Sequence, residues 1–232
     1  MNFSEKENLE LIELFKGLRV ADVRDGLDYL LLHNNFSIPY TIKPLFRIRV
    51  VGIAKTVRYI PYRGEIPKLT PEEYSEWMGY YYTHICPYPW LEEVKKGDFI
   101  VIDQSSVDAG LMGSNNSLYG FSKGVVGYLT NGGPRDTDEL ILQKIPFWSK
   151  FVSQKTVIGR LQYDAMDIPI NIEGVTVNPG DVIIADGDGV LVVPRDKAPV
   201  VAELARKELN LDKDSRRKLY DKMGWNYDNT VL

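Results

Sequence analysis

The order of apolar segments along the chain is the feature that most restricts its fold. In the first half, β-branched runs such as 46–60 and 94–103 alternate with stretches whose apolar residues recur at helical spacing. In the second half, residues 172–194 form short apolar runs separated by turn residues, with Asp188-Gly189 as a hairpin turn. Strands that alternate with helices and are followed by hairpins predict an α/β fold with a mixed sheet.

The helices can be placed from apolar periodicity and from residues typical of helix ends. Asp22 is expected to cap the second helix, and Thr70 precedes a proline and two glutamates, which is the pattern of a helix N-terminus. Helices are expected at 5–17, 22–31, from 71 onward, at 115–123, from 134 onward and from 194 to about 222, with further strands at 124–133 and 151–161 and an irregular tail.

Two stretches of the chain share one pattern. Residues 94–103 and 177–186 both read V-x-x-G-D-x-I-x-x-D. The repeat has two interpretations, an internal duplication or the same turn-plus-strand chemistry used twice. The second is favoured, because glycine and aspartate are ordinary turn residues before a buried strand.

Composition excludes several classes of function. A net charge of −4 lacks the broad positive field that nucleic-acid binding needs. One cysteine and two histidines leave no internal disulfide and no multi-histidine zinc site, so carboxylates, arginine, backbone amides and a hard metal ion would carry any chemistry. We find no signal peptide, no run of about 18 apolar residues and no nucleotide-binding glycine pattern, and therefore expect a cytoplasmic protein without membrane or nucleic-acid partners.

Residues 61–93 differ in texture from the rest of the chain. They are rich in proline, tyrosine and tryptophan. So many aromatic side chains are rarely left in solvent, and they would roof a pocket, fill a subunit interface or form an ordinary insertion into the core.

The stretch 131–139, NGGPRDTDE, is the strongest candidate for a functional site. It follows an apolar run and leads into a helix, where free N–H groups and the helix dipole favour an anion. Arg135 offers a planar, charged fork for a carboxylate or enolate oxygen. Asp136 and Glu139 are three residues apart and share one helix face, where they can hold a divalent cation. The alternative is an acidic helix start in which Asp136 only caps the helix.

Three stretches together resemble the RraA-like family, which includes class II 4-hydroxy-4-methyl-2-oxoglutarate/4-carboxy-4-hydroxy-2-oxoadipate aldolases and the ribonuclease E inhibitor RraA. They are LRVADVRDGLDYL at 18–30, GVVGYLTNGGPRDTDEL at 124–140 and GVTVNPGDVIIADGDGVLVVPR at 174–195. The resemblance implies a swivelling β/β/α domain with a mixed sheet and N- and C-terminal helices. It further implies a single domain over 1–232, with an aromatic-rich insert at about 61–93 and a C-terminal helical extension at about 195–232, assembled as a homotrimer or homohexamer.

The resemblance also implies roles for the Arg-Asp pair. Asp136 would help to hold a divalent metal ion, Mg²⁺ or Mn²⁺, and Arg135 would contact the 2-oxo oxygen of the substrate. Glu139 occupies an acidic position that one form of the family adds three residues after the aspartate. The expected catalytic residues are therefore Arg135 and Asp136, and the expected metal ligands are Asp136 and Glu139.

The predicted substrate-binding loop departs from the family pattern. The aldolases carry Asp or Gly with twenty residues between it and the Arg-Asp pair, whereas this chain has Ser114 there and Gly113 one position earlier. The backbone N–H groups of Asn115 and Asn116 would bind the substrate carboxylate. The expected substrate-binding residues are Gly113, Ser114, Asn115, Asn116 and Arg135.

The function expected from this resemblance is a metal-dependent lyase. It would cleave a carbon–carbon bond in a 4-hydroxy-2-oxo acid or oxaloacetate through a pyruvate enolate, and Lys123 would not be needed for a Schiff base. Two alternatives remain: a non-catalytic, protein-binding regulator resembling RraA, and a related enzyme on a sugar-derived acid. The family also takes an acidic residue from the C-terminal helix of a neighbouring subunit, for which Glu208, Asp212 and Asp214 are the candidates.

Overall fold

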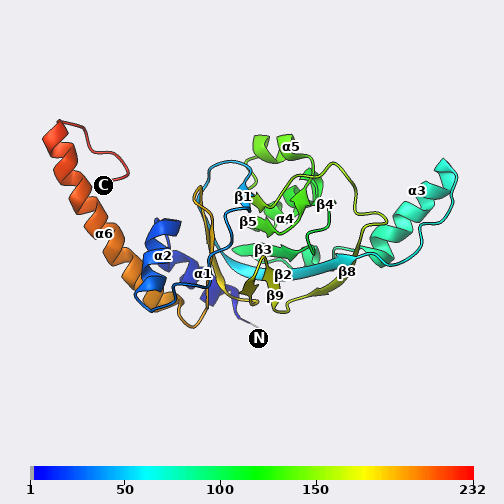
Figure 1. The fold of residues 1–232 in the computed structure, drawn as a ribbon, viewed down its shortest axis with the longest axis horizontal. Helices are drawn as coiled ribbons and strands as arrows, with labels where there is room; N and C mark the ends of the chain where they lie inside the picture. Colours follow the sequence, from blue (N-terminus) through cyan, green and yellow to red (C-terminus); the bar gives the residue numbers. More distant parts are fainter. Residues whose placement is uncertain (1–2) are drawn as a thin grey trace.

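A mixed sheet forms the centre of the computed structural model, which describes residues 3–232 (Figure 1). Its strand order is β1-β7-β5-β3-β2-β11-β12, with β8 paired to β2. Neighbouring pairs among β2, β3, β5 and β7 are parallel and the other pairs are antiparallel, which confirms the predicted mixed α/β sheet. The strands are β1 (Lys43–Pro44), β2 (Val50–Pro61), β3 (Asp98–Asp103), β5 (Gly127–Thr130), β7 (Phe147–Ser149), β8 (Leu161–Met166), β11 (Val182–Ala185) and β12 (Val190–Val193).

Both faces of the sheet are buried. Alternate residues of β3 point to opposite faces, so that Phe99 and Val101 join one apolar cluster while Ile100 and Ile102 join another. The hairpin β9 (Ile170–Ile172) and β10 (Val175–Val177) covers the first face. The second face carries two clusters, an aromatic one over β3 and β5 and an aliphatic one under the terminal helices.

The terminal helices cover the aliphatic cluster. They are α1 (Glu5–Leu14), α2 (Val20–Asp28) and the first half of α6 (Ala198–Met223). Helices α2 and α6 cross closely at Gly26. A Cβ atom at this position would lie only 2.8 Å from the Val201 carbonyl oxygen. The prediction that Asp22 caps α2 is wrong. The cap position belongs to Arg19, and Asp22 lies one turn inside the helix, where its carboxylate accepts the Arg19 N–H at 2.8 Å.

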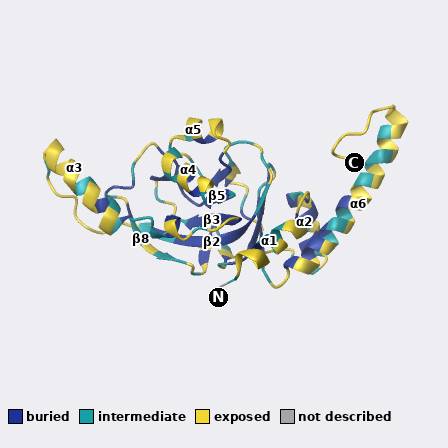
Figure 2. Ribbon diagram, turned by 180° about the vertical axis from the view of Figure 1, so that it is seen from behind, coloured by how far each residue is buried: buried dark blue, intermediate teal, exposed yellow. Residues whose placement is uncertain are grey.

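The aromatic-rich segment forms a projecting helix and a buried base. Helix α3 (Pro71–Tyr80) begins after Thr70 as predicted, and the Thr70 hydroxyl accepts the Glu73 N–H at 3.3 Å. A π-helical turn (Tyr81–Ile85) and a 3-10 turn (Pro89–Glu92) follow. Trp90 and Tyr81 in these turns are fully buried in the aromatic cluster, whereas α3 extends away from the sheet (Figures 1 and 2).

The strand predicted at 46–60 is present as β2, which begins four residues later, at Val50. The strand predicted at 151–161 is wrong, because residues 151–160 form a loop and β8 begins at Leu161. This loop uses its backbone elsewhere: Ser153 donates its N–H to the Pro134 oxygen at 3.0 Å, and Lys155 accepts the Gly110 N–H at 2.8 Å. The loop therefore braces the short strands that carry the candidate site.

The repeated V-x-x-G-D pattern forms the same turn twice. Gly97 and Gly180 have φ angles of +90° and +91°. The next residue, Asp98 or Asp181, accepts an N–H from three residues earlier at 2.8 Å in both turns. However, β3 runs parallel to β2 and β11 antiparallel to it. The two stretches thus share one turn geometry and lie in different topological settings.

The remaining helices follow the predictions closely. They are α4 (Ser114–Ser122) and α5 (Thr137–Leu142), and the hairpin turn at Asp188-Gly189 joins β11 to β12 as expected. After Met223 the chain has no regular element. Within residues 3–232, no helix combines the length and apolar character needed to cross a bilayer.

Candidate active site at Arg135 and Asp136

Two short parallel strands bring the predicted site residues together. They are β4 (Gly110–Met112) and β6 (Gly133–Pro134), and Met112 pairs with Pro134. Arg135 donates its N–H to the Met112 oxygen at 3.0 Å. Gly113, the residue after β4, is therefore held beside Arg135 although they are far apart in sequence.

Gln104, which no sequence pattern had indicated, supports this arrangement from inside the protein. It is fully buried directly after β3, and its N–H donates to the Asn131 side-chain oxygen at 2.7 Å. Its side-chain amide donates to the Val107 oxygen at 3.2 Å. Gln104 thus links the loop before β4 to the loop before β6. The available signal was a polar residue directly after a buried strand.

Asp136 has an unusual backbone and a side chain that faces another helix. It stands at the N-cap position of α5 with φ 56° and ψ 44°, in the left-handed region, and its side chain makes no capping bond. Instead, one carboxylate oxygen accepts the Ser114 N–H at 3.3 Å and the other accepts the Arg135 Nε–H at 3.3 Å. The interpretation of Asp136 as an ordinary helix cap is therefore wrong. Left-handed conformations of this kind cost about 1–3 kcal/mol and are concentrated at functional sites.

Gly113 is the position where a small side chain is required. A Cβ atom there would lie 2.5 Å from the Asp136 Oδ2 atom and 3.3 Å from the Arg135 Cγ atom. Ser114, by contrast, is the first residue of α4 and meets Asp136 through its backbone N–H. Although Ser114 occupies the position where the family spacing places Asp or Gly, the preceding residue, Gly113, lies against the Asp136 carboxylate.

The first turn of α4 faces this carboxylate. The first N–H groups of a helix have no acceptor inside the helix. In α4 these include Ser114, Asn115 and Asn116, and the Ser114 N–H donates to Asp136. The structure therefore brings Arg135, Asp136 and the predicted carboxylate-binding turn into one corner.

Glu139 is the third residue of α5, three positions after Asp136, and both side chains are exposed. Among residues 3–232, no group of three or more His, Cys, Asp or Glu side chains forms a metal-binding cluster. Two exposed carboxylates do not make a closed metal site. They fit a hard dication that keeps waters and takes further oxygen ligands from its substrate, as Mg²⁺ commonly does. The assignment of Asp136 and Glu139 as metal ligands stays a prediction.

The base of the aromatic segment lies near this corner. Burial raises the pKa of Tyr82 and Tyr88, and the positive charge of Arg135 opposes both increases. The Tyr88 hydroxyl donates to the Leu111 oxygen of β4 at 2.8 Å. Aromatic side chains therefore border the candidate site close to Arg135.

Lys123 is not suited to form a Schiff base. Its ammonium group lies 2.8 Å from a carboxylate oxygen of Glu92 and 2.9 Å from the Leu91 oxygen. The Glu92 carboxylate raises the pKa of Lys123, whereas a nucleophilic lysine needs a lowered one. Cys86 is also inert, because burial raises the pKa of its thiol to about 12.

The three acidic candidates on α6 each have a partner within the chain. Glu208 accepts the Tyr29 hydroxyl at 2.6 Å, Asp212 accepts from Arg19 at 2.7 Å, and Asp214 accepts from Arg217 at 2.8 Å. Their proposed role in a neighbouring subunit stays a prediction.

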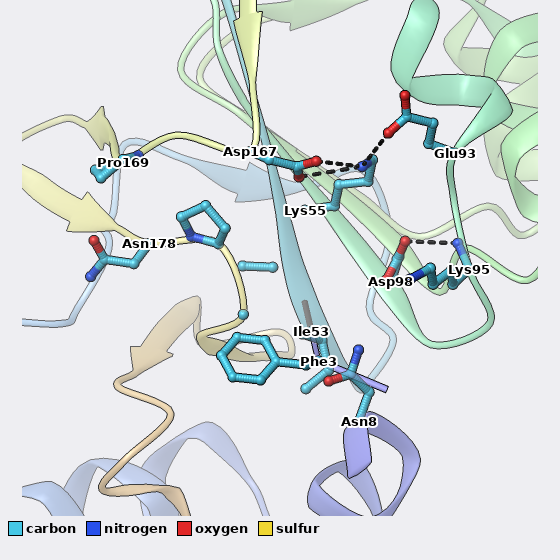
Figure 3. A pocket seen from close by; sticks show the side chains of 13 residues that line it. Phe3, Asn8, Ile53, Lys55, Glu93, Lys95, Asp98, Asp167, Pro169 and Asn178 are labelled. Carbon is cyan, nitrogen blue, oxygen red and sulfur yellow. Dashed lines mark hydrogen bonds and ion pairs between the residues drawn. The ribbon is translucent and has the colours of Figure 1, made fainter. Parts of the chain in front are cut away.

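A second polar region surrounds Lys55 and does not include Arg135 or Asp136 (Figure 3). It is an open cavity of about 450 Å³ between the N-terminal segment, β2 and the loops around 93–98 and 167–180. The Lys55 ammonium group lies 3.1 Å from Asp167 and 3.9 Å from Glu93. Lys55 shares a sheet face with Ile53 and Val57, which belong to the two separate clusters of that face. The cavity thus lies at the boundary between the terminal helices and the aromatic cluster, which cover neighbouring regions of this sheet face.

Comparison with known proteins identifies the family. Residues 20–192 match the model of the RraA-like family, described as Aldolase/RraA. The chain belongs to the RraA-like family. The match includes β4, β6, α4 and α5, and therefore the whole Arg135–Asp136 corner.

The relatives of this RraA-like chain carry different names. A Halalkalibacterium halodurans protein provisionally named 4-hydroxy-4-methyl-2-oxoglutarate aldolase is 27% identical over 92% of the chain and 90% of its own length. DlpA of Legionella pneumophila is 26% identical over 84% of the chain, which spans only 30% of DlpA. Streptomyces coelicolor RraAS2, described as an unusual member of the RNase ES inhibitor RraA family, aligns with a TM-score of 0.72 and 26% identity over 89% of the chain and 96% of its own. These names include both an enzyme and an inhibitor family.

Proposed function

We propose that this RraA-like chain is a divalent-metal-dependent lyase that cleaves a carbon–carbon bond of a small 2-oxo acid. The observation that carries the proposal is the position of the Asp136 carboxylate. It is turned away from its own helix, lies against the first N–H of α4, and keeps a side-chain exposure of 37% beside Arg135. A carboxylate held this way by strained backbone is available to a ligand.

Charge development in the reaction explains why these groups belong together. In a 4-hydroxy-2-oxo acid the 4-hydroxyl group loses its proton to a base, C4 leaves as a carbonyl compound and the C3–C4 bond breaks; in oxaloacetate C4 leaves as carbon dioxide. In both cases the electron pair of the broken bond moves onto the 2-oxo oxygen as an enolate. Arg135 supplies a fixed positive charge for that oxygen. The free N–H groups of Asn115 and Asn116 suit the adjacent carboxylate. Protonation of C3 then gives pyruvate.

The metal ion belongs to the same proposal. Asp136 and Glu139 would hold Mg²⁺ or Mn²⁺, and the bound ion would supply additional positive charge at the 2-oxo acid. Gly113 keeps room for the Asp136 carboxylate, since any side chain there would meet its Oδ2 atom. The Arg135 Nε–H contact orients the carboxylate from the other side.

A pyruvate-release assay tests the proposal. The full chain is incubated with 4-hydroxy-2-oxo acids and with oxaloacetate, in Mg²⁺, in Mn²⁺ and in excess chelator. We expect turnover of at least one of these acids that chelator abolishes and added metal restores. No metal-dependent pyruvate release from any of them would contradict the proposal.

A second function, inhibition of a ribonuclease by protein binding, is supported by the likeness to RraAS2. A binding protein has no need of a strained carboxylate beside an arginine. If the Asp136→Asn variant keeps ribonuclease inhibition while the wild type shows no lyase activity, the regulator interpretation replaces the enzyme.

A further inference from the structure

The base of the aromatic segment and the proposed active site share strand β4. The Tyr88 hydroxyl donates to the Leu111 oxygen of β4 at 2.8 Å. The rings of Tyr82 and Tyr88 pack against the apolar cluster to which β4 contributes. At the end of the same strand, the Met112 oxygen accepts the Arg135 N–H at 3.0 Å. The two rings therefore lie beside the strand that positions Arg135.

A π-helical turn gives two adjacent tyrosines different surroundings. In the turn Tyr81–Ile85, the Cys86 N–H donates to the Tyr81 oxygen at 2.8 Å, five residues back. Such turns are rare and are frequently found at functional sites. Tyr81 is fully buried, and its hydroxyl donates to the Leu161 oxygen of β8 at 2.7 Å. Tyr81 thus anchors the turn, whereas the next residue, Tyr82, is only half-buried.

The Tyr82 side chain is a neutral ring within the electrostatic field of Arg135. Burial raises the pKa of Tyr82, and the charge of Arg135 opposes that rise only in part, so the phenol stays protonated at neutral pH. Among residues 3–232, no group forms a hydrogen bond with the Tyr82 hydroxyl, whereas the hydroxyls of Tyr81 and Tyr88 donate to backbone oxygens. A tyrosine of this kind can present its ring to an apolar ligand while its hydroxyl stays in water.

Basic side chains are scarce on this side of Arg135. Residues 81–93 contain no lysine or arginine, and their single histidine is exposed. In the loop that braces β4, Lys155 is paired with the Asp108 carboxylate, and Arg160 donates to two carbonyl oxygens of its own loop. A substrate group placed against the two tyrosine rings thus meets apolar surface and, among these described residues, no uncommitted cation besides Arg135.

We propose that Tyr82 and Tyr88 form the wall that receives the C4 substituent of the substrate, and that this substituent is an uncharged aryl group. The inference rests on the proposed lyase function. In 4-hydroxy-2-oxo-4-phenylbutanoate, Arg135 meets the 2-oxo oxygen and the phenyl group packs against the two rings, offset or edge to face. The 4-hydroxyl group loses its proton to a base, the C3–C4 bond breaks with its electron pair moving onto the 2-oxo oxygen, and C3 then takes up a proton. The products are pyruvate and benzaldehyde.

Two substrates that differ at C4 test the wall in the full chain. Pyruvate release is measured with Mg²⁺ or Mn²⁺ from 4-hydroxy-2-oxo-4-phenylbutanoate and from 4-hydroxy-2-oxoglutarate, which carries a carboxylate in place of the ring. The specificity ratio is kcat/KM for the phenyl acid divided by kcat/KM for the dicarboxylate. Tyr82→Ala removes the ring, and Tyr82→Phe keeps it. The control is Tyr40→Ala, at a tyrosine that is 84% exposed and lies outside the Arg135–Asp136 corner.

We expect a wild-type ratio of at least about ten, because the phenyl group buries apolar area whereas a carboxylate against the rings loses water without gaining a partner. Tyr82→Ala should lower the ratio at least about tenfold, mainly through KM for the phenyl acid, whereas Tyr82→Phe and Tyr40→Ala should keep it. Circular dichroism checks that each variant is folded.

Two results would overturn the proposal: a wild type that prefers the dicarboxylate, or a folded Tyr82→Ala variant with an unchanged ratio. The wild-type ratio decides the question even if a variant does not fold. Turnover of the dicarboxylate or oxaloacetate without turnover of the phenyl acid would remove this inference and leave the lyase function intact. Absence of metal-dependent turnover of all three acids would contradict both.

Discussion

The Arg135–Asp136 corner and the Lys55 cavity both contain opposite charges, but they use them differently. The Lys55 side chain is only 9% exposed, and its ammonium group lies within 3.9 Å of the carboxylates of Asp167 and Glu93. The Asp136 carboxylate is 37% exposed and accepts two hydrogen bonds of 3.3 Å. The Lys55 charge already has carboxylate partners within the chain, and we expect it to support the fold and not to bind a ligand. A charge with remaining acceptor capacity on strained backbone is available to a ligand.

The largest effect is expected from removing the charge of the corner. Asp136→Asn keeps the size of the side chain and the acceptor for the Ser114 N–H, but removes the negative charge that the metal ion needs. We expect kcat/KM for pyruvate release to fall by about 10²–10³-fold or more, with an unchanged melting temperature. Steady-state kinetics and thermal unfolding check both parts. Wild-type turnover in this variant would remove Asp136 from its role.

Filling the space at Gly113 should have the next largest effect. Gly113→Ala places a Cβ atom 2.5 Å from Asp136 Oδ2, so the carboxylate must move. We expect about 10–100-fold lower kcat/KM and weaker metal activation, because small displacements at a reacting centre are costly. The matched control is Gly79→Ala, where an added Cβ atom would meet nothing within 4 Å. Equal kinetics of the two variants would show that Asp136 tolerates displacement.

Lys55 should affect stability rather than activity. Lys55→Met removes the ammonium group and leaves Asp167 and Glu93 without their partner, while keeping most of the side-chain volume. We expect a loss of about 1–3 kcal/mol in the free energy of unfolding, with kcat/KM within about twofold of wild type. Urea denaturation and the pyruvate assay distinguish the two regions. A large kinetic effect with intact stability would make the Lys55 cavity part of the active site.

The smallest effect concerns the pH dependence of stability in the same cavity. Burial raises the pKa of Asp98 above its usual 3.8, so the folded state holds this proton more tightly than the unfolded state. The stabilisation that comes from this tighter proton binding is fully present at pH values below 3.8. It is lost as the pH rises through the raised pKa of folded Asp98. Asp98→Asn still accepts the Lys95 N–H but cannot titrate.

The Asp98→Asn variant should therefore gain stability relative to wild type between about pH 4 and about pH 7, by roughly 1 kcal/mol or less. Urea denaturation at both pH values measures this difference, with Asp138→Asn on the exposed side of α5 as the control. A relative loss of stability over the same range would mean that the charged form of Asp98 is the favoured one.

Local patterns predicted those elements whose hydrogen bonds are local. The cap at Thr70, the turn at Asp188-Gly189 and the helix at 115–123 depend on neighbours in sequence, and all three are present. The strand expected at 151–161 failed, because Ser153 and its neighbours bond to β4 and β6 from a distant part of the chain.

The candidate site was predictable in its residues but not in its geometry. The Arg-Asp stretch and the family resemblance selected Arg135 and Asp136 correctly as neighbours of Gly113 and Ser114. The left-handed backbone of Asp136 and the support from buried Gln104 depend on the pairing of β4 with β6, which no local pattern reveals.

Manganese binding measured with and without an enolate analogue tests the central claim most directly. Oxalate has the charge and shape of pyruvate enolate, and free Mn²⁺ is followed by electron paramagnetic resonance. We expect wild-type protein to bind Mn²⁺ and oxalate to tighten that binding at least about tenfold, whereas Asp136→Asn should lose both effects. Equal Mn²⁺ affinity in the two proteins, or no response to oxalate, would contradict a metal and keto-acid site at Arg135 and Asp136.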